Sequence, residues 1–186
     1  MAEPVRPREL ARLIQDDPRF EEVPPDPERA RVLLVRIADE ELLSVMLQSW
    51  QAARAGPDSL HRTAHTAAYD AARKAVDAVL LAVGVRTTRL AGHHGTVAAA
   101  EVILVPPPAS RTRNVRAFGQ ARLVRHEDEY PRSVESSRIT LRERRFQTQN
   151  LVRLVHDCQE LLGLEPSVEL LPTEDRLRSW EPPHVG

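Results

Sequence analysis

The stretch that decides the fold covers residues 58–83 and reads DSLHRTAHTAAYDAARKAVDAVLLAV. Small or apolar residues recur in it at steps of three and four, as they do on one face of an α-helix. They are Leu60, Ala64, Ala67, Ala68, Ala71, Ala75, Val79 and Ala82. Asp58 and Ser59 are both good N-cap residues, and Gly84 is a favourable C-terminal cap. The pattern predicts a long helix whose small side chains let a neighbouring helix approach closely.

Four more helices are predicted around this one. Residues 28–54 follow Pro27 and end at Gly56 and Pro57, with an apolar face of Val32, Val35, Leu42, Val45, Met46, Ser49 and Trp50. Residues 95–105 end at three prolines, and residues 141–162 end at Gly163. Residues 112–130 place Val115, Phe118, Ala121 and Val124 inward. No segment alternates strictly enough for a strand, so the expected fold is all-α, an up-and-down bundle of about five helices.

The two ends of the chain are rich in proline and are expected to lie outside this bundle. Residues 1–27 form a Pro-rich leader with room for a short helix at residues 8–15, and residues 164–186 form an irregular tail. The helical bundle itself is assigned to residues 28–163.

Composition excludes several classes of protein. The 186 residues are 41% hydrophobic and 28% charged, which is typical of a globular domain. No apolar run is long enough for a membrane span, and the N-terminus has acids and prolines where a signal peptide would be basic and apolar. A single cysteine, Cys158, excludes an internal disulfide and a Cys-rich zinc module. We therefore expect a cytoplasmic protein without membrane contact.

Charge is balanced overall but uneven along the chain. The formal net charge is -1, whereas the segment from Arg111 to Arg145 holds ten arginines against five acids. Any contact with nucleic acid is therefore expected in this segment, with Arg113, Arg116 and Arg122 as the residues that bind phosphate.

Two histidine groups are weaker candidates for a site. His61, His65 and Tyr69 are spaced one helical turn apart, but Arg62 stands where a metalloprotease motif has Glu, and no third ligand is near. No metal and no cofactor is therefore expected. Arg86, Arg89, His93 and His94 lie between two helices, where they either bind an anion at a helix start or cap and pack a tight turn.

The third candidate lies near the end of the helix at residues 112–130. Arg122 and His126 share a helical face, and Arg125 can reach Glu129 one turn further on. An arginine and a neutral histidine on one phosphate could cleave RNA, because the imidazole can deprotonate a 2′-hydroxyl while the guanidinium neutralises charge on phosphorus. Arginine and histidine also occur together on many solvated helix faces.

The chain also resembles a known superfamily across about residues 28–163. The long helix from Ala64, the Gly92-His93-His94-Gly95 turn before a short helix, and Arg125 with Tyr130-Pro131 carry the resemblance. They are similar to the HEPN (higher eukaryotes and prokaryotes nucleotide-binding) superfamily.

The resemblance implies a helical bundle that commonly forms a symmetric dimer. Many members are metal-independent endoribonucleases, often toxins or defence effectors, with an arginine, a polar residue and a histidine four to six positions after the arginine. Other members lack this motif and act as binding or accessory domains. Arg125 and His126 match the first two positions, but Tyr130 stands where the catalytic histidine falls.

Two functions follow from these observations. The expected one is a non-catalytic HEPN-like domain that binds RNA, a nucleotide or a protein partner as a homodimer, through the helices at residues 58–83 and 112–130. The alternative is a metal-independent endoribonuclease that uses Arg122 or Arg125 with His126 as an Arg/His pair at the dimer interface. Tyr130 at the position of the catalytic histidine favours the non-catalytic reading, since a phenol is a poor base at neutral pH. A purely structural helical adaptor is a third reading.

Overall fold

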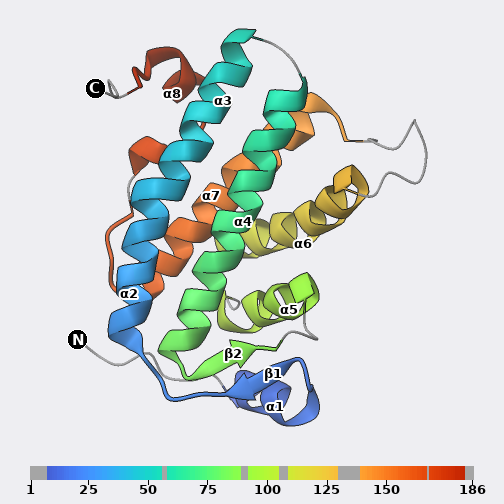
Figure 1. Cartoon of the computed structure of the whole chain (residues 1–186), viewed down its shortest axis with the longest axis vertical. Helices are drawn as coiled ribbons and strands as arrows, with labels where there is room; N and C mark the ends of the chain where they lie inside the picture. Colours follow the sequence, from blue (N-terminus) through green and yellow to red (C-terminus); the bar gives the residue numbers. More distant parts are fainter. Residues whose placement is uncertain are drawn as a thin grey trace.

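The computed structural model describes residues 8–55, 58–88, 92–104, 109–129, 139–166 and 168–182. The α-helices are α1 (Arg8–Asp16), α2 (Pro27–Arg36), α3 (Leu43–Ala55), α4 (Asp58–Ala82), α5 (Gly92–Leu104), α6 (Ala109–Glu129), α7 (Leu141–Leu161) and α8 (Glu174–Ser179). A π-helical segment, Ile37–Leu42, joins α2 to α3 without a break. The predicted all-α bundle is confirmed, and Figure 1 shows α5 and α6 side by side against the long helices.

Helix α4 is the centre of the bundle. The expected inward face is buried from Ala64 to Ala82 except for Ala67, which is half-buried. Ala72, Val76 and Leu80 on the other sides of the helix are buried as well. Helices α2, α3, α5, α6 and α7 all pack against α4. Five helices can pack around α4 because it is rich in alanine, and small side chains let the axes of neighbouring helices come close to its own. The alanine stripe that was expected at a dimer interface is therefore covered within one chain.

The continuous helix at residues 27–55 begins as predicted, with Pro27 as its first residue and Asp26 as its cap. Its apolar face does not follow the predicted stripe, because the side chains of Val32 and Val35 are 68% and 44% exposed. The intervening π-helical segment has more residues per turn than an α-helix. The side chains before it therefore point in a different direction from the one expected for a continuous α-helix. The stripe therefore holds for Leu42, Val45 and Met46, which are fully buried, but is wrong before the segment.

A small sheet corrects the expectation that the chain has no strands. β1 (Phe20–Glu22) pairs antiparallel with β2 (Val85–Thr87), with Phe20 opposite Thr87. Strands of three residues are too short to show an alternating pattern. Leu10 and Phe20 are buried, so residues 8–22 of the expected leader belong to the packed fold at the end of α4.

The C-terminal tail is also more ordered than expected. Residues 168–170 form a 3-10 turn, and α8 follows with Thr173 as its N-cap. Helix α8 packs on α3, and the rings of Trp50 and Trp180 meet edge to face with centroids 6.1 Å apart. This aromatic contact, together with a hydrogen bond from Gln149 to the carbonyl of Pro172, holds the segment against the bundle, and contacts of this kind have no periodic signal in the sequence.

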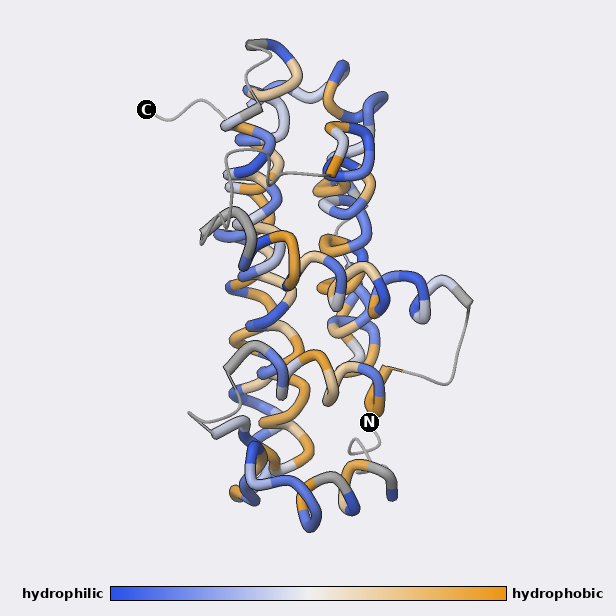
Figure 2. Tube along the Cα trace, turned by 90° about the vertical axis from the view of Figure 1, so that its right-hand side faces the viewer, coloured by the Kyte–Doolittle hydropathy of each residue, from blue (hydrophilic) through white to orange (hydrophobic). Residues whose placement is uncertain are grey.

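The helices are amphipathic rather than uniformly apolar. Figure 2 shows hydrophilic and hydrophobic positions alternating along the long helices. Among the helices described, none combines the length and the hydropathy that crossing a bilayer requires.

Candidate functional site

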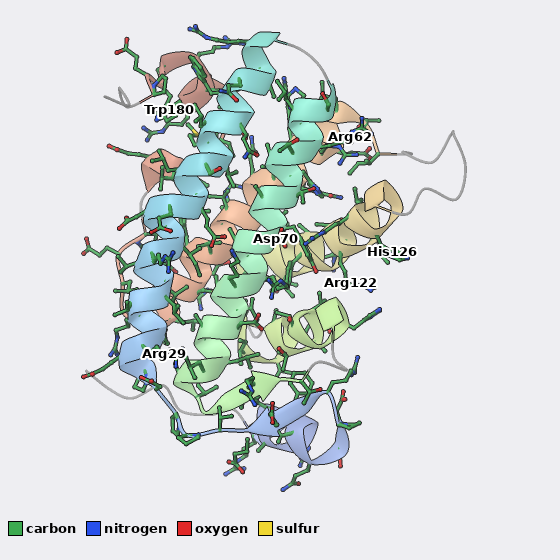
Figure 3. All side chains as sticks on the ribbon, in the orientation of Figure 1. Arg29, Arg62, Asp70, Arg122, His126 and Trp180 are labelled. Carbon is green, nitrogen blue, oxygen red and sulfur yellow. The ribbon has the colours of Figure 1, made fainter. Side chains whose placement is uncertain are left out.

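Two carboxylates of α4, Asp70 and Asp77, hold the helices that carry the candidate residues. Asp70 forms an ion pair with Arg125 of α6, and the Arg125 guanidinium also lies 5.4 Å from the ring centroid of Tyr69. Asp77 lies seven positions after Asp70, which is about two helical turns. They therefore lie on the same side of α4, and Figure 3 shows Asp70 on the side that faces α6.

Asp77 fixes the beginning of α5 and the strand before it. Its carboxylate accepts a hydrogen bond from Arg73 at 3.0 Å, and longer ones from Thr87 of β2 and Thr96 of α5, both at 3.4 Å. Burial raises the pKa of Asp77, and the Arg73 charge and the threonine hydrogen bonds oppose that rise. Thr96 lies two residues after His94, so the hydrogen bond from Thr96 to Asp77 also fixes the position of His94.

The result of these two anchors is a direct contact between α5 and α6. Nη1 of Arg122 lies 2.6 Å from Nε2 of His94. Because a guanidinium can only donate hydrogen bonds, the contact requires Nε2 of His94 to be unprotonated, with the imidazole proton on Nδ1. Desolvation, followed by the charges of Arg122, Arg19 and His126, lowers the pKa of His94. The structure therefore favours a neutral imidazole at neutral pH.

Basic side chains from three separate segments lie close together here: Arg19, His94 of α5, and Arg122 with His126 of α6. Arg19 precedes β1 and is paired with Asp17, while Arg122 and His126 come from α6. His94 and His126 are exposed, and Arg122 is half-buried. Helix α5 begins at Gly92, so its first backbone N–H groups lie beside His94. An anion such as a phosphate is attracted to such a place by charge and by hydrogen-bond donors.

The structure separates the predicted arginines into different roles. Arg122 and His126 lie at the α5–α6 surface, as Figure 3 shows, while Arg113 and Arg116 are exposed elsewhere on α6. Arg125 forms an ion pair with Asp70. The expected pairing of Arg125 with Glu129 stays a prediction, because the Glu129 side chain lies outside the described residues. Sequence reasoning missed Asp70 and Asp77, which together with Asp58 are the acidic residues of α4.

The remaining candidates near α5 have different outcomes. His94, expected only as a secondary candidate, is the residue that meets Arg122. Arg86 pairs with Glu21 across the small sheet at 2.7 Å, so it supports the strand pair. Arg89, the His93 side chain and Tyr130 lie outside the described residues.

The stripe of His61, His65 and Tyr69 is part of the core. His65 is fully buried with Nε2 2.9 Å from Oε1 of Gln147, and His61 is also buried. The Tyr69 ring lies 5.2 Å from that of Phe118, and burial raises the Tyr69 pKa to about 12. Across the residues that are described, no three histidine, cysteine, aspartate or glutamate side chains cluster as metal ligands would.

Comparison with protein-family models finds no match, and comparison with curated proteins and with solved structures likewise finds no similar protein.

Proposed function

We propose that this protein is an HEPN-like helical domain that binds RNA through its phosphate groups at the α5–α6 surface, as a homodimer. The observation that carries the proposal is the contact between Arg122 and His94, with Arg19 and His126 beside it. A phosphate could replace His94 as the acceptor of the Arg122 hydrogen bonds, since guanidinium groups bind phosphate oxygens in a forked geometry.

The affinity for RNA is expected to be weak and dependent on salt. The whole chain has a formal net charge of -1, so only the local arginines can release counterions from the RNA. Arg113 and Arg116, exposed on the same helix as Arg122, would add phosphate contacts along the strand.

Fluorescence anisotropy with a labelled single-stranded RNA tests the binding proposal. Arg122→Ala and His126→Ala should weaken binding, and Arg29→Ala should not, because Arg29 is an exposed arginine on α2, far from Arg122 (Figure 3). Equal affinities for all four proteins, each shown to be folded by circular dichroism, would contradict RNA binding at this surface.

The homodimer of the proposal follows from the resemblance to HEPN domains, and α6 is the helix through which we test it, because α4 is covered within one chain. Leu123 of α6, next to Arg122, is 54% exposed and can be replaced without disturbing the core. Size-exclusion chromatography with light scattering should give twice the chain mass of 20.9 kDa, and Leu123→Glu should reduce it to one chain. A wild-type mass of one chain at micromolar concentration would contradict the dimer.

Metal-independent RNA cleavage is the second candidate function, and the neutral state of His94 favours it. Once a phosphate oxygen accepts the hydrogen bond that Arg122 donates to His94, Nε2 of His94 is free to take the proton of a 2′-hydroxyl. The 2′ oxygen then forms a bond to phosphorus, the bond from phosphorus to the 5′ oxygen breaks, and the leaving oxygen takes a proton from solvent. Arg122 would neutralise the charge that develops on phosphorus.

Incubation of the protein with tRNA in the presence of EDTA distinguishes cleavage from binding. Cleavage would leave 2′,3′-cyclic phosphate ends and would be lost in His94→Ala. Loss in His126→Ala with His94→Ala still active would identify His126 as the base instead. Because the pKa of His94 is lowered, the activity should persist to a pH below the ordinary histidine pKa of about 6.5 before it falls. RNA that binds and stays intact supports the non-catalytic function.

A further inference from the structure

A second surface, away from α5 and α6, is a groove of about 720 Å³ between α7, α8 and the end of α3. Its walls are the first two turns of α7, the helix α8 and residues 53 and 54 of α3. Figure 1 shows α8 beside the upper end of α3, where the chain approaches its C-terminus.

The groove is strongly cationic. Arg54, Arg142, Arg145 and Arg178 line it, and Glu174 is the one acid among its lining residues. Glu174 is already paired with Arg178 at 2.7 Å. The other three arginines form no ion pair within the described part of the chain. Arg54 lies 4.6 Å from the ring centroid of Trp50, and the buried Nε of Arg145 has no hydrogen-bond partner there, although the Arg145 charge helps to lower the pKa of Glu174.

The same groove exposes apolar side chains that the fold does not cover. Leu141 is 39% exposed and Phe146 is 49% exposed, and Leu177 of α8 lines the opposite wall. Arg142 and Phe146 are one turn apart on α7, as are Leu141 and Arg145, so cationic and apolar positions alternate in two adjacent rows. An isolated exposed leucine needs no explanation, but two large apolar side chains among unpaired arginines form a binding surface.

We propose that this groove binds an acidic amphipathic helix of a partner protein. Such a helix presents leucine-like side chains at steps of three and four to the apolar rows, and carboxylates to Arg54, Arg142 and Arg145. The proposal is independent of RNA binding at Arg122, because it uses other helices and other residues.

The lining favours a protein helix over single-stranded RNA. Surfaces that bind single strands stack successive bases on aromatic side chains, and Phe146 is the one aromatic residue that lines this groove. Leu141, Leu177, Pro172 and Ala53 are aliphatic and suit the apolar face of a helix.

Binding in the groove can be measured directly by fluorescence, because the two tryptophans of the chain, Trp50 and Trp180, lie beside it. Trp50 lies under Arg54, which lines the groove, and against Trp180, which follows α8. A fluorescein-labelled helical peptide of about 15 residues, with leucine at one face and glutamate elsewhere, is titrated into the full chain and followed by anisotropy. An unlabelled copy is used for tryptophan emission. We expect saturable binding with a shift of that emission.

Matched variants locate the binding. Arg142→Glu and Phe146→Ser, both at exposed positions, should each weaken the peptide affinity about tenfold. Arg29→Glu, an exposed arginine at the opposite end of the molecule, should leave it unchanged (Figure 3). Unchanged melting temperatures show that each variant is folded.

Three results would overturn the proposal. The first is no saturable binding of the peptide up to about 100 µM. The second is equal binding of a peptide whose leucines are serine, because charge alone would then explain the affinity. The third is competition by a single-stranded oligouridine that loses its own affinity in Arg142→Glu, which would assign the groove to RNA.

Discussion

Arg125 of α6 and Asp70 of α4 form an ion pair that joins residues 55 positions apart in the chain. Their side chains are 19% and 32% exposed, so the pair is largely removed from solvent. The Tyr69 ring beneath the guanidinium completes the contact. Because Arg122 stands one turn before Arg125, this pair holds Arg122 where it meets His94.

Arg125→Ala should destabilise the fold by about 1 to 2 kcal/mol, because Asp70 loses its partner while it remains partly buried. Urea unfolding followed by circular dichroism measures the change. Arg36→Ala is the control: the Arg36–Glu40 pair is 69% and 60% exposed, and such pairs contribute less than about 1 kcal/mol. Equal losses of stability in the two variants would show that burial does not increase the contribution of the Arg125–Asp70 pair to the free energy of unfolding.

The RNA affinity should fall steeply with salt and with the loss of α6 arginines. Replacing Arg113, Arg116 and Arg122 together with alanine removes up to three phosphate contacts, so the slope of log affinity against log salt should become shallower by about two units. Anisotropy titrations over a range of potassium chloride concentrations measure the slope. Binding that persists at about 0.5 M salt, or an unchanged slope in the triple variant, would contradict electrostatic binding at α6.

His156 of α7 should make the fold sensitive to acid. It is buried, its Nε2 has no hydrogen-bond partner among the described residues, and burial lowers its pKa to about 4. The unfolded chain, with a histidine pKa of about 6.5, binds the proton first, so stability falls as the pH drops from about 6.5 to about 4. The full loss is on the order of 3 kcal/mol.

The variant His156→Leu isolates this effect from opposing groups. Burial raises the pKa values of Asp77 and Asp157, so these carboxyls favour the folded state as the pH falls and partly offset the histidine. Unfolding free energies measured between pH 7 and pH 4 should decline less in His156→Leu than in the wild type. Parallel curves would show that His156 is not the group that titrates.

Cys158 should react with thiol reagents only after the protein unfolds. The side chain is fully buried, and burial raises the pKa of its thiol, so both access and the thiolate form are suppressed. Ellman's reagent added to the native protein should give no colour on the timescale on which it reacts completely in guanidinium chloride. Rapid reaction under native conditions would show that the core around Cys158 opens locally at a small cost in free energy.

The sequence alone was sufficient to locate the long helices. Their periodicity and their terminators act locally, so α4, α6 and α7 begin and end close to the predicted residues, and Val115, Phe118 and Ala121 are buried as expected. The all-α class follows from the same local patterns.

The tertiary structure decided everything that depends on which helix faces which. The π-helical segment turned Val32 and Val35 outward, and the chain ends packed through long-range contacts such as the β1–β2 pair and Trp50 with Trp180. His94 and Arg122 are 28 residues apart and belong to two candidate groups that the sequence kept separate. They meet because Asp70 and Asp77 fix α6 and α5 on one side of α4, and a contact between distant residues has no local pattern from which it can be predicted.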